Sequence, residues 1–262
     1  MFNFLSIEFF FLGLIAAVAG SAMGLGGGFI ILPYLLWRFP FIKPAEAVVV
    51  SLSGVFTTNF LATWIHVRKR TISLREVYWI APLGILGAVL ASPIPGLMSR
   101  GQFEWAYFAI VLALLLRTVW AVRPSSQSKA SSNSEIKKSP LSLRRTIWPM
   151  VPIVSAFAAA FGVGGGIILM PLLLSNRFGL TTAHAAALSA IIQLFGTGSA
   201  LFSRFDLIRV LIGSVLSIAL GVLAGVPLGI RVSHRLPRRT AKLILILVLS
   251  LIATQIFFRK TF

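Results

Sequence analysis

The chain has 262 residues, of which 57% are hydrophobic and 11% are charged, and its formal net charge is +18. Soluble domains usually carry about 25% charged residues, so this composition excludes an ordinary soluble protein. The chain has no cysteine, which excludes disulfides, thiolate metal sites and cysteine nucleophiles. The basic residues lie between apolar blocks, as at the cytoplasmic ends of membrane helices, and this distribution argues against a nucleic-acid partner.

Apolar segments follow one another along the chain, and most of them are long enough to cross a hydrocarbon core of about 30 Å as a helix. The alternation of a β-barrel is absent. We therefore predict an all-α polytopic membrane protein that contacts the lipid bilayer. In chain order the segments are 7–22 with 28–37, 45–66, 77–98, 103–122, 147–161 with 166–176, 183–203, 208–230 and 240–258.

One glycine-rich sequence occurs twice. Residues 24–36 read GLGGGFIILPYLL and residues 162–174 read GVGGGIILMPLLL, an offset of 138 positions. The same offset pairs Ser51 with Ser189. We therefore predict two homologous four-segment units, 1–122 and 147–262, joined by a polar cytoplasmic linker, 123–146, that is rich in serine and lysine.

Each unit begins with a segment that the glycine cluster interrupts. Consecutive glycines each cost a helix about 1 kcal/mol relative to alanine. In lipid such a break must be buried in protein or line a cavity. The interrupted segment could cross the membrane or re-enter it as a hairpin. The second arrangement puts a larger share of the 24 Lys and Arg on one side, so the positive-inside rule favours it. It also makes the two units inverted, with three transmembrane helices each, and lets the hairpin tips meet near the midplane.

A glycine-rich tip leaves backbone N–H groups free at the start of its second half-helix, where the helix dipole favours an anion. Paired interrupted segments in matching units are the usual place of a transporter's substrate site. The predicted substrate-binding glycines are Gly24, Gly26, Gly27 and Gly28 in the first unit and Gly162, Gly164, Gly165 and Gly166 in the second. Five other glycines are expected to serve close helix packing: Gly84, Gly87, Gly221, Gly225 and Gly229.

Polar residues inside the apolar segments are few, so each one carries information. Ser51 and Ser189 could donate hydrogen bonds to an anion between the tips, or bond other helices instead. Asn59 and Gln193 are interpreted as lining a cavity.

Ionisable residues are scarcer still. Glu46 and His184 occupy the same repeat position and could couple transport to protons, or could sit at interfacial helix ends. Nothing predicts a metal site, a cofactor or a catalytic set, so the chain is not expected to be an enzyme.

At the duplicated motif the chain resembles the TauE/SafE family of sulfite exporters and related anion permeases. The resemblance extends over the whole chain and includes the stretches Ala47 to Ser51 and Ala185 to Ser189. It implies transport of sulfite, thiosulfate, sulfoacetate or another sulfur oxyanion across the bacterial inner membrane. The chain has Val50-Ser51 where the family often has a Thr-Ser pair.

Together these observations predict a multi-pass secondary transporter that holds a small sulfur oxyanion between the tips and works by alternating access. Export is the expected direction, because an inside-negative potential expels anions. Two alternatives stay open: an uncoupled anion channel, and a permease for a different small organic anion. The sequence leaves the oligomeric state undefined.

Overall fold

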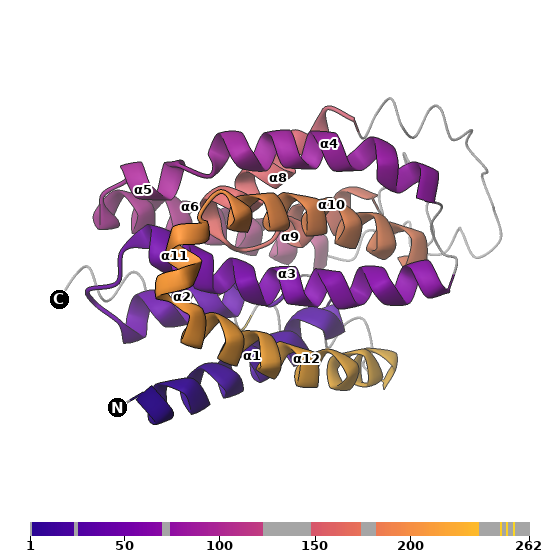
Figure 1. Cartoon of the computed structure of the whole chain (residues 1–262). Coiled ribbons are helices and arrows are strands. Elements are labelled where there is room, and N and C mark those ends of the chain that lie inside the picture. Colours follow the sequence, from indigo (N-terminus) through magenta and orange to yellow (C-terminus); the bar gives the residue numbers. More distant parts are fainter. Residues whose placement is uncertain are drawn as a thin grey trace.

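The computed structural model describes residues 2–23, 26–69, 74–122, 148–173 and 182–235, with the single residues 247, 250 and 254. Regular structure within these ranges is entirely helical (Figure 1). The linker 123–146, Gly24 and most of the expected segment 240–258 lie outside the described residues. The helices are α1 (Phe2–Met23), α2 (Gly28–Arg38), α3 (Pro44–Arg68), α4 (Leu74–Ala91), α5 (Ile94–Leu97), α6 (Arg100–Val122), α8 (Met150–Phe161), α9 (Gly166–Leu173), α10 (Thr182–Phe202), α11 (Phe205–Val210) and α12 (Ile212–Arg235).

Four helical stretches of the described chain are long and apolar enough to cross a membrane: Pro44–Arg68, Ile80–Leu97, His184–Phe202 and Ile212–Arg231. The prediction of an all-helical membrane fold is thereby confirmed for these residues. Two expected segments are divided. Segment 77–98 bends between α4 and α5 at Pro93, which has no N–H to continue the helix. Segment 208–230 is divided at Leu211, between α11 and α12.

Helix boundaries in the two predicted units fall at the same offset as the repeated sequence. α1 and α8 end 138 residues apart, and the starts of α2 and α9, of α3 and α10, and of α4 and α12 are separated by the same interval. The shared glycine cluster explains the first two boundaries, because it ends one helix and begins the next in each unit.

Both interrupted segments fold back on themselves. In the first hairpin, α1–α2, Glu8 near the start of α1 accepts hydrogen bonds from Tyr34 and from Arg38 at the end of α2. Closer to its tip, a Cβ on Gly27 would lie 3.1 Å from the Ala16 backbone. In the second hairpin, α8–α9, a Cβ on Gly165 would meet the side chain of Val154.

The hairpin arms differ in length. α2, α8 and α9 have 11, 12 and 8 residues. The described residues of these helices span about 16, 18 and 12 Å, so none of the three described stretches is long enough to cross a hydrocarbon core of about 30 Å. α1, with 22 residues, begins earlier than the expected segment 7–22 and is about 33 Å long.

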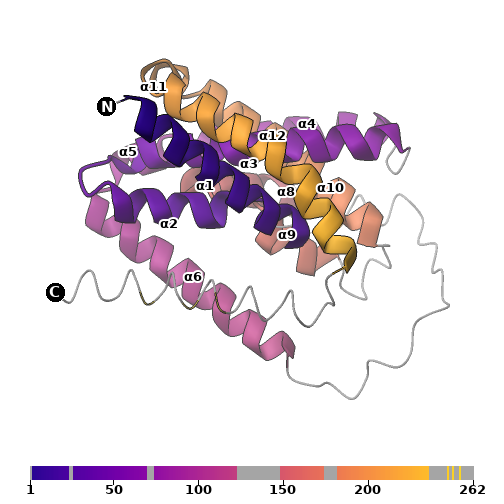
Figure 2. The ribbon, with the colours of Figure 1, turned by 90° about the horizontal axis from the view of Figure 1, so that it is seen from below.

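Each hairpin packs its first arm against a helix of the other unit. α1 lies beside α12 in Figures 1 and 2, and α8 contacts α4. Glycines permit these close contacts, since a Cβ on Gly221 would overlap the Phe10 carbonyl and one on Gly87 would overlap the Pro152 carbonyl. A Cβ on Gly225 would lie 2.5 Å from the Leu14 oxygen. The predicted packing role of these glycines is confirmed.

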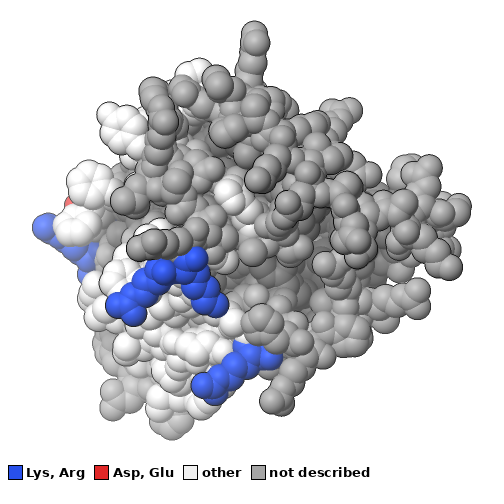
Figure 3. Space-filling model, turned by 90° about the vertical axis from the view of Figure 1, so that its right-hand side faces the viewer, with Lys and Arg blue, Asp and Glu red and all other residues white. Residues whose placement is uncertain are grey.

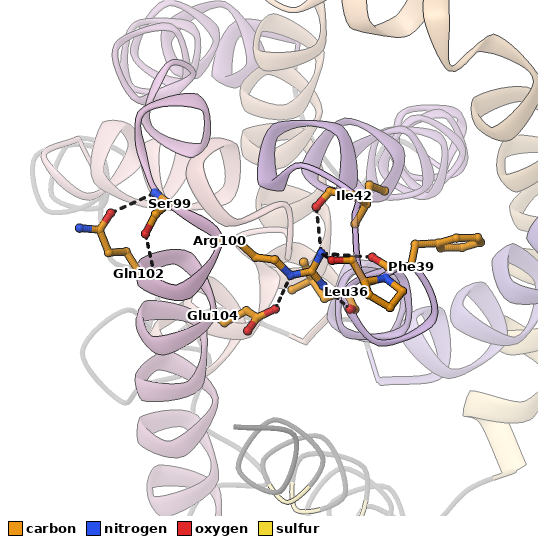
Figure 4. A network of polar contacts seen from close by, with 8 residues as sticks. Leu36, Phe39, Ile42, Ser99, Arg100, Gln102 and Glu104 are labelled. Carbon is orange, nitrogen blue, oxygen red and sulfur yellow. Dashed lines mark hydrogen bonds and ion pairs between the residues drawn. The ribbon is translucent and has the colours of Figure 1, made fainter. Parts of the chain in front are cut away.

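Arg100, at the start of α6, holds the open end of the first hairpin (Figure 4). Its guanidinium donates to the carbonyl of Leu36 at 2.6 Å and to that of Ile42 at 3.1 Å, while Glu104 accepts from its Nε at 2.8 Å. The side chain thus ties the last turn of α2 and the loop that follows it to the start of α6.

The two hairpins point in opposite directions. After α4 the chain continues through α5 to Arg100. Arg100 lies at the open end of the first hairpin, opposite its tip. The tip of the second hairpin approaches that same end, because Arg204 binds the carbonyls of Ala159 in α8 and Ser92 after α4. Figure 1 shows the corresponding arrangement, with α3 and α10 starting at opposite ends.

Candidate functional site

The two hairpin tips, residues 26–28 and 162–166, meet inside the molecule beside α3. The hydroxyl of Ser51 on α3 lies 2.7 Å from the carbonyl oxygen of Gly162 and 3.3 Å from that of Gly28, so it donates to either tip. Ser51 is fully buried. One side chain of the first unit therefore joins both tips, which the sequence places 134 positions apart.

Left-handed backbone shapes the tips. Gly26, Gly162 and Gly164 have φ angles of 74°, 64° and 79°, a region that glycine enters without strain. Gly162 closes α8 by donating its N–H to the Ala158 carbonyl at 2.8 Å. Gly26 and Gly164 occupy the same repeat position, so the two tips turn alike.

The second arm of each hairpin begins with donors that its own helix cannot satisfy. The carbonyl of Gly27 accepts the N–H groups of Ile30 and Ile31, and that of Gly165 accepts those of the corresponding residues in α9. The N–H groups of Gly28 and Phe29 come before the first such bond and have no helical acceptor. Glycine at the N-cap has no side chain to bind them, so the positive end of the α2 dipole stays uncapped by its own residues.

The tips touch at one point and leave room at another. A Cβ on Gly28 would overlap the Gly162 carbonyl oxygen and lie 2.6 Å from Cγ2 of Val55, so no anion fits between these two glycines in this conformation. At Gly26 the nearest atoms to a Cβ are Oε1 of Gln193 and Cγ1 of Val55, both at 3.7 Å. The space at Gly26 therefore takes about one methyl group, and a larger ligand binds there only when the surrounding atoms move apart.

Gln193 faces this space from α10. Its Nε2 donates to the Ser189 hydroxyl at 2.9 Å and to the Ser189 carbonyl at 3.1 Å. Its Oε1 is buried, with no hydrogen-bond partner among the described residues. The equivalent position of the first unit is Val55, so one unit places an amide and the other an apolar side chain where the tips meet.

The predicted site residues are only partly brought together. Gly26, Gly28, Ser51, Gly162, Gly165, Ser189 and Gln193 lie in one cluster through the contacts above. Asn59 lies one turn beyond Val55 on α3.

Glu46 and His184 lie near the starts of α3 and α10, at opposite ends of the molecule. Glu46 accepts the Lys43 N–H at 3.2 Å and so caps the start of α3, as the alternative interpretation of this residue expected.

Arg204 was not predicted as a site residue. It lies between α10 and α11 and is 8% exposed. It donates to the Ala159 carbonyl at 3.1 and 3.2 Å and to the Ser92 carbonyl at 2.9 Å. Burial lowers its pKa to about 10, so the guanidinium stays charged at neutral pH. Its positive charge lies next to the carbonyl end of α8, three residues before Gly162. A lone arginine in a short loop gives no sequence signal of this contact.

A hollow of about 720 Å³ lies on the outer face of α4 between Tyr78 and Val89, with Phe195 of α10 beside it. Its lining is apolar and several of its side chains are exposed. These properties suit lipid tails and not an anion.

Opposed, glycine-tipped hairpins within a bundle of apolar helices define a polytopic membrane protein of the transporter class. The chain belongs to the sulfite exporter TauE/SafE family, whose profile matches residues 9–256. The resemblance noted in the sequence is thereby confirmed.

Several relatives are named as probable membrane transporter proteins. The chain is 25% identical over 207 residues to the probable membrane transporter protein YunE of Bacillus subtilis (strain 168), covering 72% of this chain and 74% of that protein. It is 23% identical over 222 residues to a probable membrane transporter protein of Haemophilus influenzae, covering 79% and 80% of the two chains. A probable membrane transporter protein of Xylella fastidiosa (strain 9a5c) is 26% identical over 200 residues, covering 73% and 72%. No solved structure matches the chain at a significant level.

Proposed function

We propose that this membrane transporter is a secondary transporter, most directly an exporter, of a small sulfur-containing oxyanion such as sulfite, thiosulfate or sulfoacetate, in the bacterial inner membrane. The observation that carries the proposal is the arrangement at Gly26, where an uncapped helix N-terminus, a left-handed glycine and the Gln193 amide come together. Membership of the sulfite exporter family supports the choice of sulfite-like substrates.

The binding step uses donors that the resting structure holds in place. The N–H groups at the start of α2 supply hydrogen bonds and the positive end of a helix dipole. Because Oε1 of Gln193 would repel an anion, the amide turns about its Cγ–Cδ bond on binding and presents Nε2 in its place. Oε1 then takes the place of Nε2 beside Ser189 and accepts a hydrogen bond from its hydroxyl.

Release follows from the geometry of the tips. Gly28 and Gly162 are in contact now and Ser51 joins both, so an anion passes only when the tips separate. Rocking of one unit against the other would break the two Ser51 contacts in turn and open the site to alternate sides. Since an inside-negative potential drives anions outward by about 2.3 kcal/mol per charge per 100 mV, export needs no coupling ion. Glu46 and His184 remain candidates for proton coupling only.

Flux measurements in liposomes test this function. The purified chain is reconstituted, and uptake of sulfite, thiosulfate, sulfoacetate, sulfate and chloride is compared over a range of concentrations. Saturable transport of at least one sulfur anion in preference to chloride is expected. Rapid, unsaturated chloride flux would instead establish an anion channel, and saturable flux of non-sulfur anions alone would establish a different permease.

Re-entry of the first hairpin is tested separately. Cysteines introduced singly as Asn3→Cys and Pro40→Cys into the cysteine-free chain should be labelled from the same side of the membrane. Labelling from opposite sides would show that the interrupted segment crosses the membrane.

A further inference from the structure

We propose that one face of α3, formed by Asn59, Thr63 and His66, is the access pathway along which the anion passes between the hairpin tips and the end of α3 that carries Arg68 and Lys69. This proposal rests on the proposed function, because it assigns a route to the same substrate. It also specifies which side of the site is open in the present conformation.

The first observation is a row of buried polar atoms without partners. Nδ2 of Asn59, Oγ1 of Thr63 and Nδ1 of His66 are each buried and make no hydrogen bond to any described residue. Each such atom costs about 1–3 kcal/mol unless water or a ligand satisfies it, and folded proteins leave few of them. Three in eight consecutive residues therefore indicate a place that water or a polar solute occupies.

The second observation is their alignment. Residues four and seven positions apart lie on one face of a helix, about 6 and 10 Å along its axis. Val55, one turn before Asn59, is the residue of α3 that touches Gly26 and Gly28. The row therefore begins one turn from the tips and continues toward the end of the helix.

Thr63 differs from Thr57 and Thr58 in its side-chain hydrogen bonding. The hydroxyls of Thr57 and Thr58 bond the carbonyls four residues earlier in the same helix, at 2.8 and 2.9 Å. This is the usual outcome for threonine in an apolar helix. No such bond is made by Thr63, although its hydroxyl is buried. Its donor stays available for a solute.

The corresponding face of α10 is closed. At the offset of 138 residues, Asn59, Thr63 and His66 correspond to Thr197, Leu201 and Arg204. Thr197 donates to the Gln193 carbonyl at 2.7 Å, Leu201 is apolar and buried, and Arg204 is bound to the carbonyls of Ala159 and Ser92. An anion would find no free donor there. The two faces are therefore equivalent in position and different in state, as alternating access requires.

The mouth of the α3 face is basic. Arg68 and Lys69 are exposed where α3 ends, and Arg231 is exposed near the end of α12. Figure 3, which views this end of the molecule, shows blue basic side chains among the residues that the structure describes there. Positive charge at the mouth raises the local concentration of anions. The tips, the polar row and the basic mouth thus follow one another along α3.

Cysteine accessibility tests the route, because the natural chain has no cysteine. Asn59→Cys and Thr63→Cys are compared with the matched controls Thr197→Cys and Leu201→Cys in sealed vesicles. The probe is 2-sulfonatoethyl methanethiosulfonate, a sulfonate, with its trimethylammonium analogue as the cationic reference. Exposed Lys69→Cys identifies the vesicle side at which α3 ends.

The sulfonate reagent is expected to modify Asn59→Cys and Thr63→Cys at least tenfold faster than either control, from the side that labels Lys69→Cys, and in preference to the cationic reagent. Reaction no faster than that of Leu201→Cys, or only from the opposite side, would overturn the pathway. If sulfur anions are transported but the α3 cysteines stay unreactive, the pathway is refuted and the proposed substrate is not. If these cysteines react as expected and no sulfur anion is transported, the proposed substrate is refuted and the pathway is not.

Discussion

Adding one methyl group at Gly28 should separate the hairpin tips. Alanine at this position places its Cβ over the Gly162 carbonyl oxygen and 2.6 Å from Cγ2 of Val55, where carbon atoms normally stay more than about 3.4 Å apart. Gly162 cannot yield easily, because the Ser51 hydroxyl holds its oxygen at 2.7 Å. The tips must move apart by about an ångström.

The size of the effect follows from two opposing terms. Alanine is favoured over glycine within a helix by about 0.5–1 kcal/mol. Overpacking of a filled interior costs about 1–3 kcal/mol. The net result for Gly28→Ala is a protein that still folds, with its unfolding free energy lowered by up to about 2 kcal/mol. Transport should fall more steeply, by at least about tenfold, because the displaced tips carry the anion site.

The chain supplies matched controls. Gly96 lies in α5 and Gly213 in α12, and a Cβ at either position has no atom within 4 Å. Flux in proteoliposomes and thermal unfolding in detergent are measured for Gly28→Ala, Gly96→Ala and Gly213→Ala. The double variant Gly28→Ala/Val55→Ala should stay impaired, because it removes only the side-chain overlap. Wild-type flux and stability in Gly28→Ala would refute the contact between the tips.

Three further predictions concern buried polar groups. Ser51→Ala should lower the unfolding free energy by about 1–3 kcal/mol, because a buried carbonyl loses its donor. The Ser53 hydroxyl bonds only its own helix, so Ser53→Ala should lower the unfolding free energy by less than about 1 kcal/mol. Equal losses would contradict the role of Ser51. Gln193→Leu should raise the KM for the transported anion about 10- to 100-fold with little change in thermal stability, since a hydrogen bond to an anion contributes about 1.5–3 kcal/mol. An unchanged KM would show that Gln193 does not bind the anion. Arg204→Met should destabilise the protein by more than Arg204→Lys does, because two buried carbonyls lose their donors. Burial lowers the pKa of Arg204 only to about 10, so the group is charged in both folded and unfolded chains below that value and the difference in stability should not vary between about pH 5 and pH 8. A pH-dependent difference in unfolding midpoints would argue against the buried arginine.

Much of the fold could be predicted from local sequence, because membrane insertion and helix breaking are local properties. A long apolar run must form a helix to satisfy its backbone in lipid. A glycine cluster must end one, and the structure begins α2 and α9 at Gly28 and Gly166, within the clusters that the sequence identified. The bend at Pro93 was missed because the apolar run continues through it, although the missing N–H of proline ends α4 in the folded chain.

The site was predictable in its residue types and only partly in its arrangement. Paired glycine clusters indicated hairpin tips, and the pairing of Ser51 with Ser189 indicated two equivalent hydroxyls. Equivalence in sequence did not extend to contacts. In the folded protein Ser51 bonds the backbone of both tips, while the Ser189 hydroxyl accepts from Gln193.

Hydrophobicity and helix propensity act over a few residues, so a helical membrane protein with two glycine breaks at a fixed interval could be predicted without a structure. The place where the breaks meet and the donors that stay free follow from helix packing. Those outcomes depend on contacts between distant segments, such as Ser51 with Gly162, Gly26 beside Gln193, and Arg204 with Ala159. No local pattern encodes them, because a side chain's partner is fixed only when whole helices pack.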